Sequence, residues 1–317
     1  MKTTMKIIRG VHNLTSAHHG CVATIGNFDG VHLGHQQIFA HLKKQATQLA
    51  LPSLVITFEP HPFEFFQPNA APSRLTCFRE KMTLFAKQGI HQVLCIPFNA
   101  AFANLTAELF IEQILVKKLG VKLLVVGDDF RFGKKRQGDF HMLSQAGIKY
   151  HFSVEDTPTL TLSNERVSST RVRYALEQSD LTLTATLLGN PYFIIGRIVH
   201  GDKRGRLLGF PTANIPLSRK TCAIHGVFAV TITGIDHQVY QGVANIGKRP
   251  TIGDRQQPIL EVHLFNFNRE IYGQSIQVNF LKQIRQEKQF ASLEQLQTQI
   301  SHDIDIAKHF FEIDIKK

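Results

Sequence analysis

Residues 26–35 constrain the fold of this chain more than any other segment. They read GNFDGVHLGH, they directly follow the apolar run 21–25, and a helical pattern of apolar residues begins at their end. Glycine lets backbone N–H groups approach an anion closely, and the N-terminus of a helix carries a partial positive charge. The segment therefore predicts a strand that ends in a phosphate-binding turn at the start of a helix.

Two histidines lie at the end of this segment. His32 and His35 are three residues apart, so on the predicted helix they share one face, with Cβ atoms about 5–6 Å apart. We predict that both contact the phosphates of a nucleotide. The alternatives are a glycine-rich turn with surface histidines, or one half of a zinc site. The sequence offers no cysteine pair and no third ligand nearby at zinc spacing.

Composition limits the size and class of the protein. The chain has 317 residues, of which 43% are hydrophobic and 19% charged, as in ordinary globular proteins. At about 150 residues per domain, this length predicts two domains. No apolar stretch reaches about 18 residues, the N-terminal segment lacks the apolar region of a signal peptide, and the four cysteines are scattered. We therefore expect a cytoplasmic protein with reduced thiols and no membrane partner.

The chain is basic, with a formal net charge of +11 at pH 7. Such a balance suits anionic ligands, nucleic acid included. Several of the basic residues fall in glycine-rich loops, at 134–136 and 203–206, instead of one continuous tract. The sequence carries no basic–aromatic RNA-binding signature and no recognisable reading helix. We therefore expect small anionic substrates and no nucleic-acid partner.

The first half of the chain alternates short apolar runs with helical patterns. The runs lie at 21–26, 53–58, 92–97 and 122–127, and the helical patterns at 35–50, 78–88 and 105–118. This alternation predicts a parallel sheet with helices on both faces. In such sheets, ligands bind beyond the carboxyl ends of the strands.

Beyond about residue 190 the pattern changes. Apolar residues alternate with period two over 193–199, 227–231 and 239–243, which predicts a small antiparallel barrel. A helical pattern returns at 292–311. We therefore expect two domains, formed by residues 1–185 and 186–317.

The glycine–histidine segment has a recognisable form. It resembles the first signature of the nucleotidyltransferases, in the flavin adenylyltransferase branch, and residues 167–173 (VSSTRVR) resemble the second signature, SSTxxR. The resemblance implies that His32, His35 and Arg173 stabilise charge as pyrophosphate leaves. It implies ATP contacts from Gly26, Phe28, Asp29, Gly30, Gly34, Ser168, Ser169 and Thr170. On residue type alone, the Ser-Ser-Thr run is equally typical of a helix cap.

Two further segments resemble the flavin side of the same enzymes: FEPHP at 58–62 and GDDFRFG at 127–133. Aromatic rings suit a planar isoalloxazine. The resemblance implies flavin contacts from Phe58, Pro60, His61, Asp129, Phe130 and Phe132. The alternatives are a proline-fixed turn, phenylalanines that belong to the core, and aspartates that cap the turn.

A second candidate site lies at 201–214, GDKRGRLLGFPTAN. Thr212 and Asn214 share one face of an extended segment and carry oxygen ligands suited to Mg²⁺. The stretch resembles the riboflavin kinase signature, which implies ATP contacts from Gly201, Lys203, Gly205, Arg206, Gly209, Phe210 and Pro211. The same resemblance places the catalytic base at Glu261; a solvent-facing strand carboxylate is the alternative. Asn266 departs from the pattern, which usually has an acid there.

The resemblance covers about residues 10–311. Over this range the chain resembles the bifunctional riboflavin kinase/FMN adenylyltransferase family. The resemblance implies an N-terminal α/β nucleotidyltransferase domain with a Rossmann-like parallel sheet. It further implies a C-terminal antiparallel β-barrel of riboflavin kinase type with a terminal helix. The expected substrates are riboflavin, FMN and ATP with Mg²⁺, without a tightly held prosthetic group; weak self-association stays open. The rivals are another nucleotidyltransferase, a nucleic-acid binder, and a flavin-binding regulator without catalysis.

Overall fold

The computed structural model describes residues 4–201, 209–249 and 257–314. The chain divides into two compact units. The first comprises Met1–Pro72 and Lys81–Ser168, and the second comprises Ser73–Glu80 and Ser169–Lys317. Within the described stretches, no helix combines the length and the apolar character needed to cross a bilayer.

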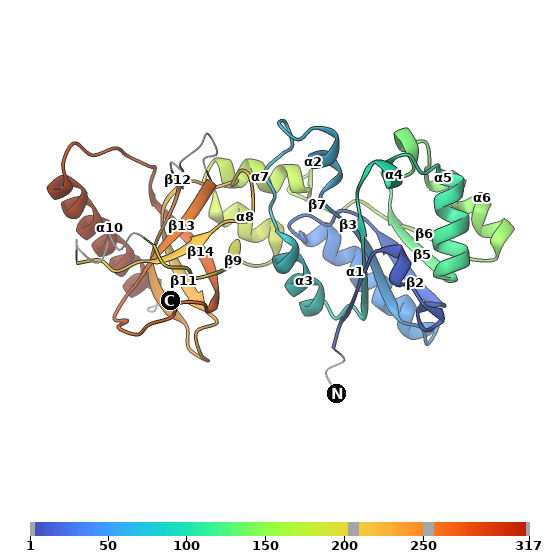
Figure 1. The fold of residues 1–317 in the computed structure, drawn as a ribbon, viewed down its shortest axis with the longest axis horizontal. Helices are drawn as coiled ribbons and strands as arrows, with labels where there is room; N and C mark the ends of the chain where they lie inside the picture. The colour runs from blue at the N-terminus through green and yellow to red at the C-terminus, as the bar shows by residue number, and fades with distance from the viewer. Residues whose placement is uncertain (1–3, 202–208, 250–256, 315–317) are drawn as a thin grey trace. The chain divides into compact units, whose positions relative to one another are not determined.

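A six-stranded parallel sheet forms the centre of the first unit (Figure 1). Its strands lie in the order β1-β4-β3-β2-β5-β6. Every residue of β2 is buried, as is typical of a parallel strand covered on both faces. The predicted parallel sheet is thus confirmed. The strands are β1 (Lys6–Arg9), β2 (Cys21–Ile25), β3 (Ser53–Glu59), β4 (Gln92–Pro97), β5 (Val121–Gly127) and β6 (Ser153–Thr157).

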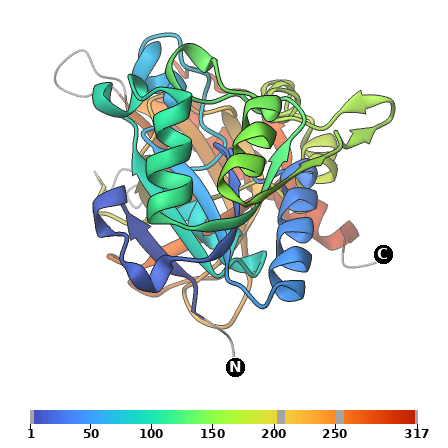
Figure 2. The ribbon, with the colours of Figure 1, turned by 90° about the vertical axis from the view of Figure 1, so that its right-hand side faces the viewer.

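Helices cover both faces of this sheet. On one face, α1 (Leu33–Gln48) and α3 (Phe78–Lys87) meet through the rings of Phe39 and Phe85, 5.3 Å apart. The other face carries α5 (Ala107–Leu109), the π-helical stretch η3 (Phe110–Lys118) and α6 (Phe140–Tyr150), which lie in front in Figure 2. The smaller elements of this unit are η1 (Val11–Asn13), η2 (Ser16–His18), α2 (Pro62–Phe66), α4 (Ala100–Ala103), η4 (Lys134–Arg136) and the hairpin β7 (Thr161–Leu162) with β8 (Glu165–Arg166).

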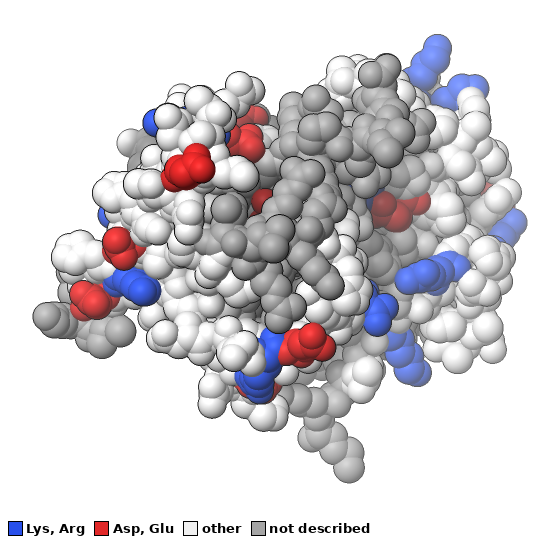
Figure 3. All heavy atoms as spheres, turned by 60° about the vertical axis from the view of Figure 1, so that its left-hand side comes forward, with Lys and Arg blue, Asp and Glu red and all other residues white. Residues whose placement is uncertain are grey.

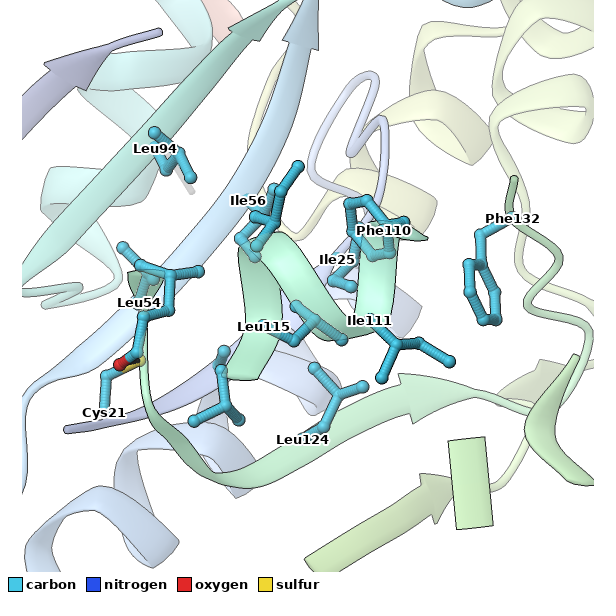
Figure 4. Packing of buried hydrophobic residues seen from close by; sticks show 14 of the residues in the cluster. Cys21, Ile25, Leu54, Ile56, Leu94, Phe110, Ile111, Leu115, Leu124 and Phe132 are labelled. Atoms are coloured by element: carbon cyan, nitrogen blue, oxygen red, sulfur yellow. Dashed lines mark hydrogen bonds between the residues drawn. The ribbon is translucent and has the colours of Figure 1, made fainter. Parts of the chain in front are cut away.

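The core under η3 is shown in Figure 4. Phe110 and Leu115 of η3 face Ile25 of β2 and Leu124 of β5, and Phe132 lies at the edge of this cluster. Apolar side chains at alternate strand positions thus meet a helix face that repeats every three or four residues. Burial of such side chains stabilises a fold by roughly 1.5–3 kcal/mol each.

The order of the strands creates a switch point beside β2. After β2 the chain passes to β3 on one side, and after β4 it returns to β5 on the other side. The carboxyl ends of β3, β2 and β5 are therefore neighbours. Ligands of open parallel sheets bind where the strand order reverses in this way. The first candidate site begins at this edge.

The second unit contains a six-stranded antiparallel sheet in the order β10-β13-β12-β11-β14-β9. An antiparallel bridge between Val199 and Asn214 joins the segment after β9 to β10 at the opposite edge, so the sheet nearly closes. The predicted antiparallel barrel is confirmed in this nearly closed form. The strands are β9 (Phe193–Arg197), β10 (Ala213–Pro216), β11 (Gly226–Thr233), β12 (Tyr240–Arg249), β13 (Gln257–Leu264) and β14 (Ser275–Arg285).

The predicted terminal helix is present as α10 (Leu293–Asp314), and it packs on this sheet. Ile304, Ala307 and Phe311 of α10 form one cluster with Ala229 and Phe265. The unit also holds α7 (Ser169–Glu177) and α8 (Leu181–Leu188), which contact each other, and α8 contacts β14.

The division of the chain differs from the expected boundary at 185/186. The second unit begins at Ser169 and also takes Ser73–Glu80, because α8 packs on β14 and Glu80 pairs with Arg219. Sequence periodicity does not reveal such packing, since the residues that meet lie far apart in the chain.

Candidate active sites

The turn after β2 adopts a backbone that requires glycine. Gly30 has φ 81°, and its neighbours Phe28 and Val31 also have positive φ, at 48° and 47°. Positive φ at a non-glycine residue is strained and tends to occur at functional sites. A Cβ atom at Gly26 would lie 2.9 Å from the ring of Phe28. The first signature therefore needs its glycines for both conformation and space.

The two histidines come together at the start of α1, as their spacing predicts. His32 is the N-cap residue, and its Nδ1 accepts a hydrogen bond from the backbone N–H of His35 at 3.4 Å. The two rings stack with centroids 3.6 Å apart and planes 21° apart. Both rings therefore present one surface above the positive end of the helix.

His35 is neutral at physiological pH. Burial lowers the pKa of His35 well below its usual value of 6.5, and the nearby His32, Lys81 and Arg166 lower it further. Its Nδ1 is buried and has no hydrogen-bond partner among the described residues. Buried polar atoms are normally paired, so this nitrogen is suited to an oxygen atom of a ligand.

Sequence reasoning missed Lys81 and Arg166 as neighbours of His35. Lys81 is 3% exposed, and Arg166 lies at the end of the β7–β8 hairpin. Neither stands in a recognisable motif, and only the fold brings their charges to the histidine. Together they make this edge of the sheet positive and therefore suited to phosphate.

The loop after β5 is fixed by polar contacts of its aspartates. Asp129 accepts a hydrogen bond from Arg166 Nη2 at 2.7 Å, and Asp128 accepts one from the hydroxyl of Thr159 at 2.6 Å. Arg166 therefore contacts the flavin-side loop of the sequence prediction and also influences His35. Arg166 thus links the segments that follow β2 and β5 beside the switch point.

The two phenylalanines of this loop differ in burial. Phe130 is half-buried, whereas Phe132 is 9% exposed and lies 5.6 Å from the ring of Phe110 in the core. Their rings stack with centroids 5.5 Å apart and planes 12° apart. Only Phe130 is accessible enough to offer a ring to a planar ligand directly, and Phe132 supports it from behind.

At the end of β3, His61 caps the short helix α2. Its Nδ1 accepts a hydrogen bond from the N–H of Phe63 at 3.2 Å. Pro60, in a cis peptide with Glu59, precedes it. The ring of Phe58 packs on those of Phe98 and Phe102.

The sequence analysis did not single out the exposed aromatic side chains of α2. Phe63, Phe65 and Phe66 are 49%, 37% and 62% exposed. They are visible in the sequence as the run FEFF at 63–66.

The second signature straddles the division of the chain. Ser168 is the last residue of the first unit, whereas Ser169, Thr170 and Arg173 belong to α7 in the second. Arg173 Nε donates a hydrogen bond to the carbonyl oxygen of Ser73 at 2.7 Å. The hydroxyl residues thus stand at a helix start, as the motif predicts.

Strand register brings the candidate kinase residues into one row across the barrel. Glu261 of β13 lies directly opposite Asn214 of β10 on one side and Asn245 of β12 on the other. Directly opposed residues in an antiparallel sheet share one face. The flanking Leu260 and Val262 are fully buried, whereas Glu261 is half-buried. The carboxylate therefore lies on the face opposite the core, beside two carboxamides.

The stretch Phe210–Asn214 is tied to the same strand. His263 Nδ1 donates a hydrogen bond to the carbonyl oxygen of Pro211 at 2.9 Å, and the rings of His263 and Phe210 meet edge to face. A Cβ atom at Gly201 would lie 2.4 Å from the Asn214 side chain, so glycine permits this close approach. Gly209 has φ 84°. The predicted contacts Lys203, Gly205 and Arg206 lie outside the described residues.

The donor atoms around Asn214 fit Mg²⁺. Asn214 Nδ2 donates to the carbonyl oxygen of Thr212 at 3.2 Å, which turns its Oδ1 away from that contact. The hydroxyl of Thr212, this Oδ1 and the carboxylate of Glu261 are all oxygen donors. Mg²⁺ takes few protein ligands and completes its shell with water and phosphate. Among the described residues, no cluster of three or more His, Cys, Asp or Glu side chains could hold a metal ion.

Two protein-family models match this chain, one in its N-terminal half and one in its C-terminal half. The family model described as FAD synthetase matches residues 14–171, and the one described as riboflavin kinase matches residues 188–311. A solved crystal structure described as a macrolide-efflux protein from Streptococcus pneumoniae is 29% identical, with a TM-score of 0.79 over 96% of this chain and 99% of that chain.

Curated relatives match nearly the whole chain. A bifunctional riboflavin kinase/FMN adenylyltransferase from Escherichia coli (strain K12) is 50% identical over 309 residues, covering 97% of this chain and 98% of the relative. One of the same name from Haemophilus influenzae is 48% identical over 307 residues, covering 97% and 99%. Two family models in sequence order, two corresponding units and these relatives lead to one conclusion: the chain belongs to the bifunctional riboflavin kinase/FMN adenylyltransferase family.

Proposed function

We propose that this chain converts riboflavin into FMN at Glu261 and FMN into FAD at the paired histidines, with ATP in both steps. The observation that carries this proposal is that the two candidate sites lie in different units. The stacked pair of His32 and His35 lies at the switch point of the parallel sheet, and Glu261 lies beside Asn214 on the antiparallel sheet. As functional regions we propose residues 1–185 for adenylyl transfer and 186–317 for the kinase.

In adenylyl transfer, a phosphate oxygen of FMN attacks the α-phosphorus of ATP, and pyrophosphate leaves. No protein nucleophile is required, so the protein positions the reactants and stabilises charge. Because His35 is neutral, it binds phosphate by an N–H hydrogen bond and not as a cation. We assign the fixed positive charge to Arg173, whose planar fork suits phosphate oxygens. We assign the flavin to the segments that carry Phe58, Pro60, His61, Asp129, Phe130 and Phe132.

In the kinase step, Glu261 accepts the proton of the ribityl 5′-hydroxyl as that oxygen attacks the γ-phosphorus of ATP, and ADP leaves. A positioned base of this kind contributes roughly 10²–10⁴ in rate. Thr212 and Asn214 would hold Mg²⁺, which supplies charge stabilisation on the phosphates when bound. His263 holds the Pro211 carbonyl, and so fixes the segment that bears both metal ligands beside Glu261.

We further propose a cytoplasmic protein whose partners are small molecules, not nucleic acid. On the face shown in Figure 3, lysine and arginine lie in separate small groups among uncharged side chains and form no continuous patch. Nucleic-acid binders instead gather basic side chains on one face or along one helix.

The proposal is tested by a time course with riboflavin, ATP and Mg²⁺, in which flavins are separated chromatographically and ADP and pyrophosphate are measured together. We expect FMN to appear first and FAD after it, with one ADP for each riboflavin consumed and one pyrophosphate for each FAD. FAD formed without pyrophosphate, or no flavin product at all, would contradict the proposal.

A further inference from the structure

Arg173 is held by a segment far from it in the sequence. Its Nε donates a hydrogen bond to the carbonyl oxygen of Ser73, 2.7 Å away. The N–H groups of a guanidinium lie in one plane, so a fixed Nε–H bond also fixes the direction of the two terminal nitrogens. The orientation of Arg173 therefore depends on the position of the Ser73 carbonyl.

Residues 73–77 form neither helix nor strand, so other groups must hold their backbone. Leu75 is fully buried, and its carbonyl oxygen accepts a hydrogen bond from the hydroxyl of Tyr192 at 3.1 Å. The N–H of Cys77 donates to Glu80 Oε2 at 2.6 Å. We call residues 73–80 the anchored segment. A remote side chain, Tyr192, holds it at Leu75, and the side chain of Glu80 holds it at Cys77 from within the segment.

A buried ion pair fastens the end of the anchored segment. Arg219 Nη2 donates to both carboxylate oxygens of Glu80, at 2.7 and 2.8 Å, and the two side chains are 2% and 0% exposed. Arg219 Nη1 donates to the hydroxyl of Tyr192 at 2.9 Å. Burial raises the pKa of Tyr192, so its hydroxyl keeps the proton that it donates to Leu75. The Arg219 guanidinium thus supports both the Tyr192 hydroxyl that bonds Leu75 and the Glu80 carboxylate that bonds Cys77.

We propose that Tyr192 and Arg219, although they lie in the region matched by the riboflavin kinase model, are positioning residues for FMN adenylyl transfer. They fix the anchored segment, the segment fixes the Ser73 carbonyl, and that carbonyl orients Arg173. The inference rests on the proposed role of Arg173 at the triphosphate. It goes beyond that role, because it makes adenylyl transfer depend on side chains outside the region that carries its motifs.

The first test is Tyr192→Phe in the full chain, which removes only the hydroxyl. Misplacement of a positioning group by about 1 Å can cost 10²-fold in rate. We expect kcat for FMN to FAD to fall about tenfold, within that range, while riboflavin phosphorylation by the same preparation stays near wild type. Tyr240→Phe is the matched control, because the hydroxyl of Tyr240 donates its hydrogen bond to Asp236, which is not part of the anchored segment. Unchanged adenylyl transfer in a folded Tyr192→Phe protein would overturn the inference.

The second test places Tyr192→Phe in an Arg173→Lys background, which keeps the charge but lacks the planar fork. If Tyr192 acts through Arg173, its loss adds little further decrease there, because coupled residues are non-additive. An equal decrease in both backgrounds would show a general structural role and overturn the inference. If Arg173→Lys alone leaves adenylyl transfer unchanged, the proposed role of Arg173 fails and the inference fails with it.

The third test addresses the ion pair itself. Glu80→Gln removes one charge of the buried pair, and Asp303→Asn does the same to the pair of Asp303 with Arg285, 2.9 Å apart, in the same unit. We expect both variants to lose thermal stability, but only Glu80→Gln to lose adenylyl transfer measured below its unfolding temperature. Equal adenylyl transfer in the two folded variants would contradict the positioning role.

Discussion

Single histidines of this protein take different roles because their surroundings differ. His35 is half-buried beside positive charges and stays neutral, and its buried Nδ1 has no protein partner within the described chain. His61 caps a helix, and His263 holds a carbonyl oxygen of the kinase segment. The residue type alone says little about function, whereas the contacts of each ring decide it.

His32→Ala should lower FAD formation from FMN by about 10²–10³-fold, which is the typical cost of losing one donor to developing charge. Riboflavin phosphorylation should be unchanged, since no residue of that site is altered. His41→Ala is the matched control on the same helix, because His41 pairs with Glu155 at 2.6 Å. Near-normal adenylyl transfer by His32→Ala in steady-state assays would remove His32 from the mechanism.

His35 also makes stability depend on pH. Its pKa is lowered in the folded state, by burial first and then by His32, Lys81 and Arg166. As pH falls below about 6.5, the unfolded chain binds a proton that the folded chain does not, so stability falls. The contribution is fully present above about pH 6.5 and is lost between that value and the lowered pKa.

The unfolding temperature of the wild type should therefore decrease more than that of His35→Gln when the buffer changes from about pH 7.5 to about pH 5.5. Scanning calorimetry on both proteins measures the difference. Parallel curves for the two proteins would show that His35 binds its proton equally well in the folded state.

At the level of elements, the strands and helices predicted from the sequence are those marked by a continuous apolar run or by a clear helical repeat. β2, β3, β4 and β5 are apolar runs, and α10 repeats every three or four residues. β1 and β6 are edge strands of mixed polarity, so no run marks them. α6 was also missed. It contains Gly147, where a Cβ atom would lie 2.5 Å from the Phe152 carbonyl oxygen, so packing and not helix propensity selects the residue.

Helix α10 should contribute strongly to the stability of the second unit. Phe311 is 5% exposed against the sheet, and Phe→Ala changes in a core cost about 3–5 kcal/mol. We expect Phe311→Ala to lower the unfolding temperature by several degrees and to weaken kinase activity near that temperature. Ile313→Ala is the control, because Ile313 is 48% exposed. Equal unfolding temperatures for the two variants would show that α10 does not stabilise the sheet.

At the level of the whole molecule, sequence could locate each motif but not its remote neighbours. GNFDGVHLGH and GFPTAN are local, so their backbone and ligand chemistry can be read from consecutive residues. Lys81, Arg166 and the anchored segment reach their partners only through folding. The packing units divide at other residues than the proposed functional regions for the same reason, since the pair of Glu80 and Arg219 joins residues far apart in the chain.

The central claim is that one chain holds two chemically separate sites, one at His32 and one at Glu261. The most direct measurement gives folded Glu261→Gln and His32→Ala proteins either riboflavin or FMN, each with ATP and Mg²⁺, and quantifies the flavins formed. Glu261→Gln should make no FMN from riboflavin yet make FAD from FMN, and His32→Ala should accumulate FMN from riboflavin without FAD. Loss of both reactions together in either folded variant would contradict the two-site account.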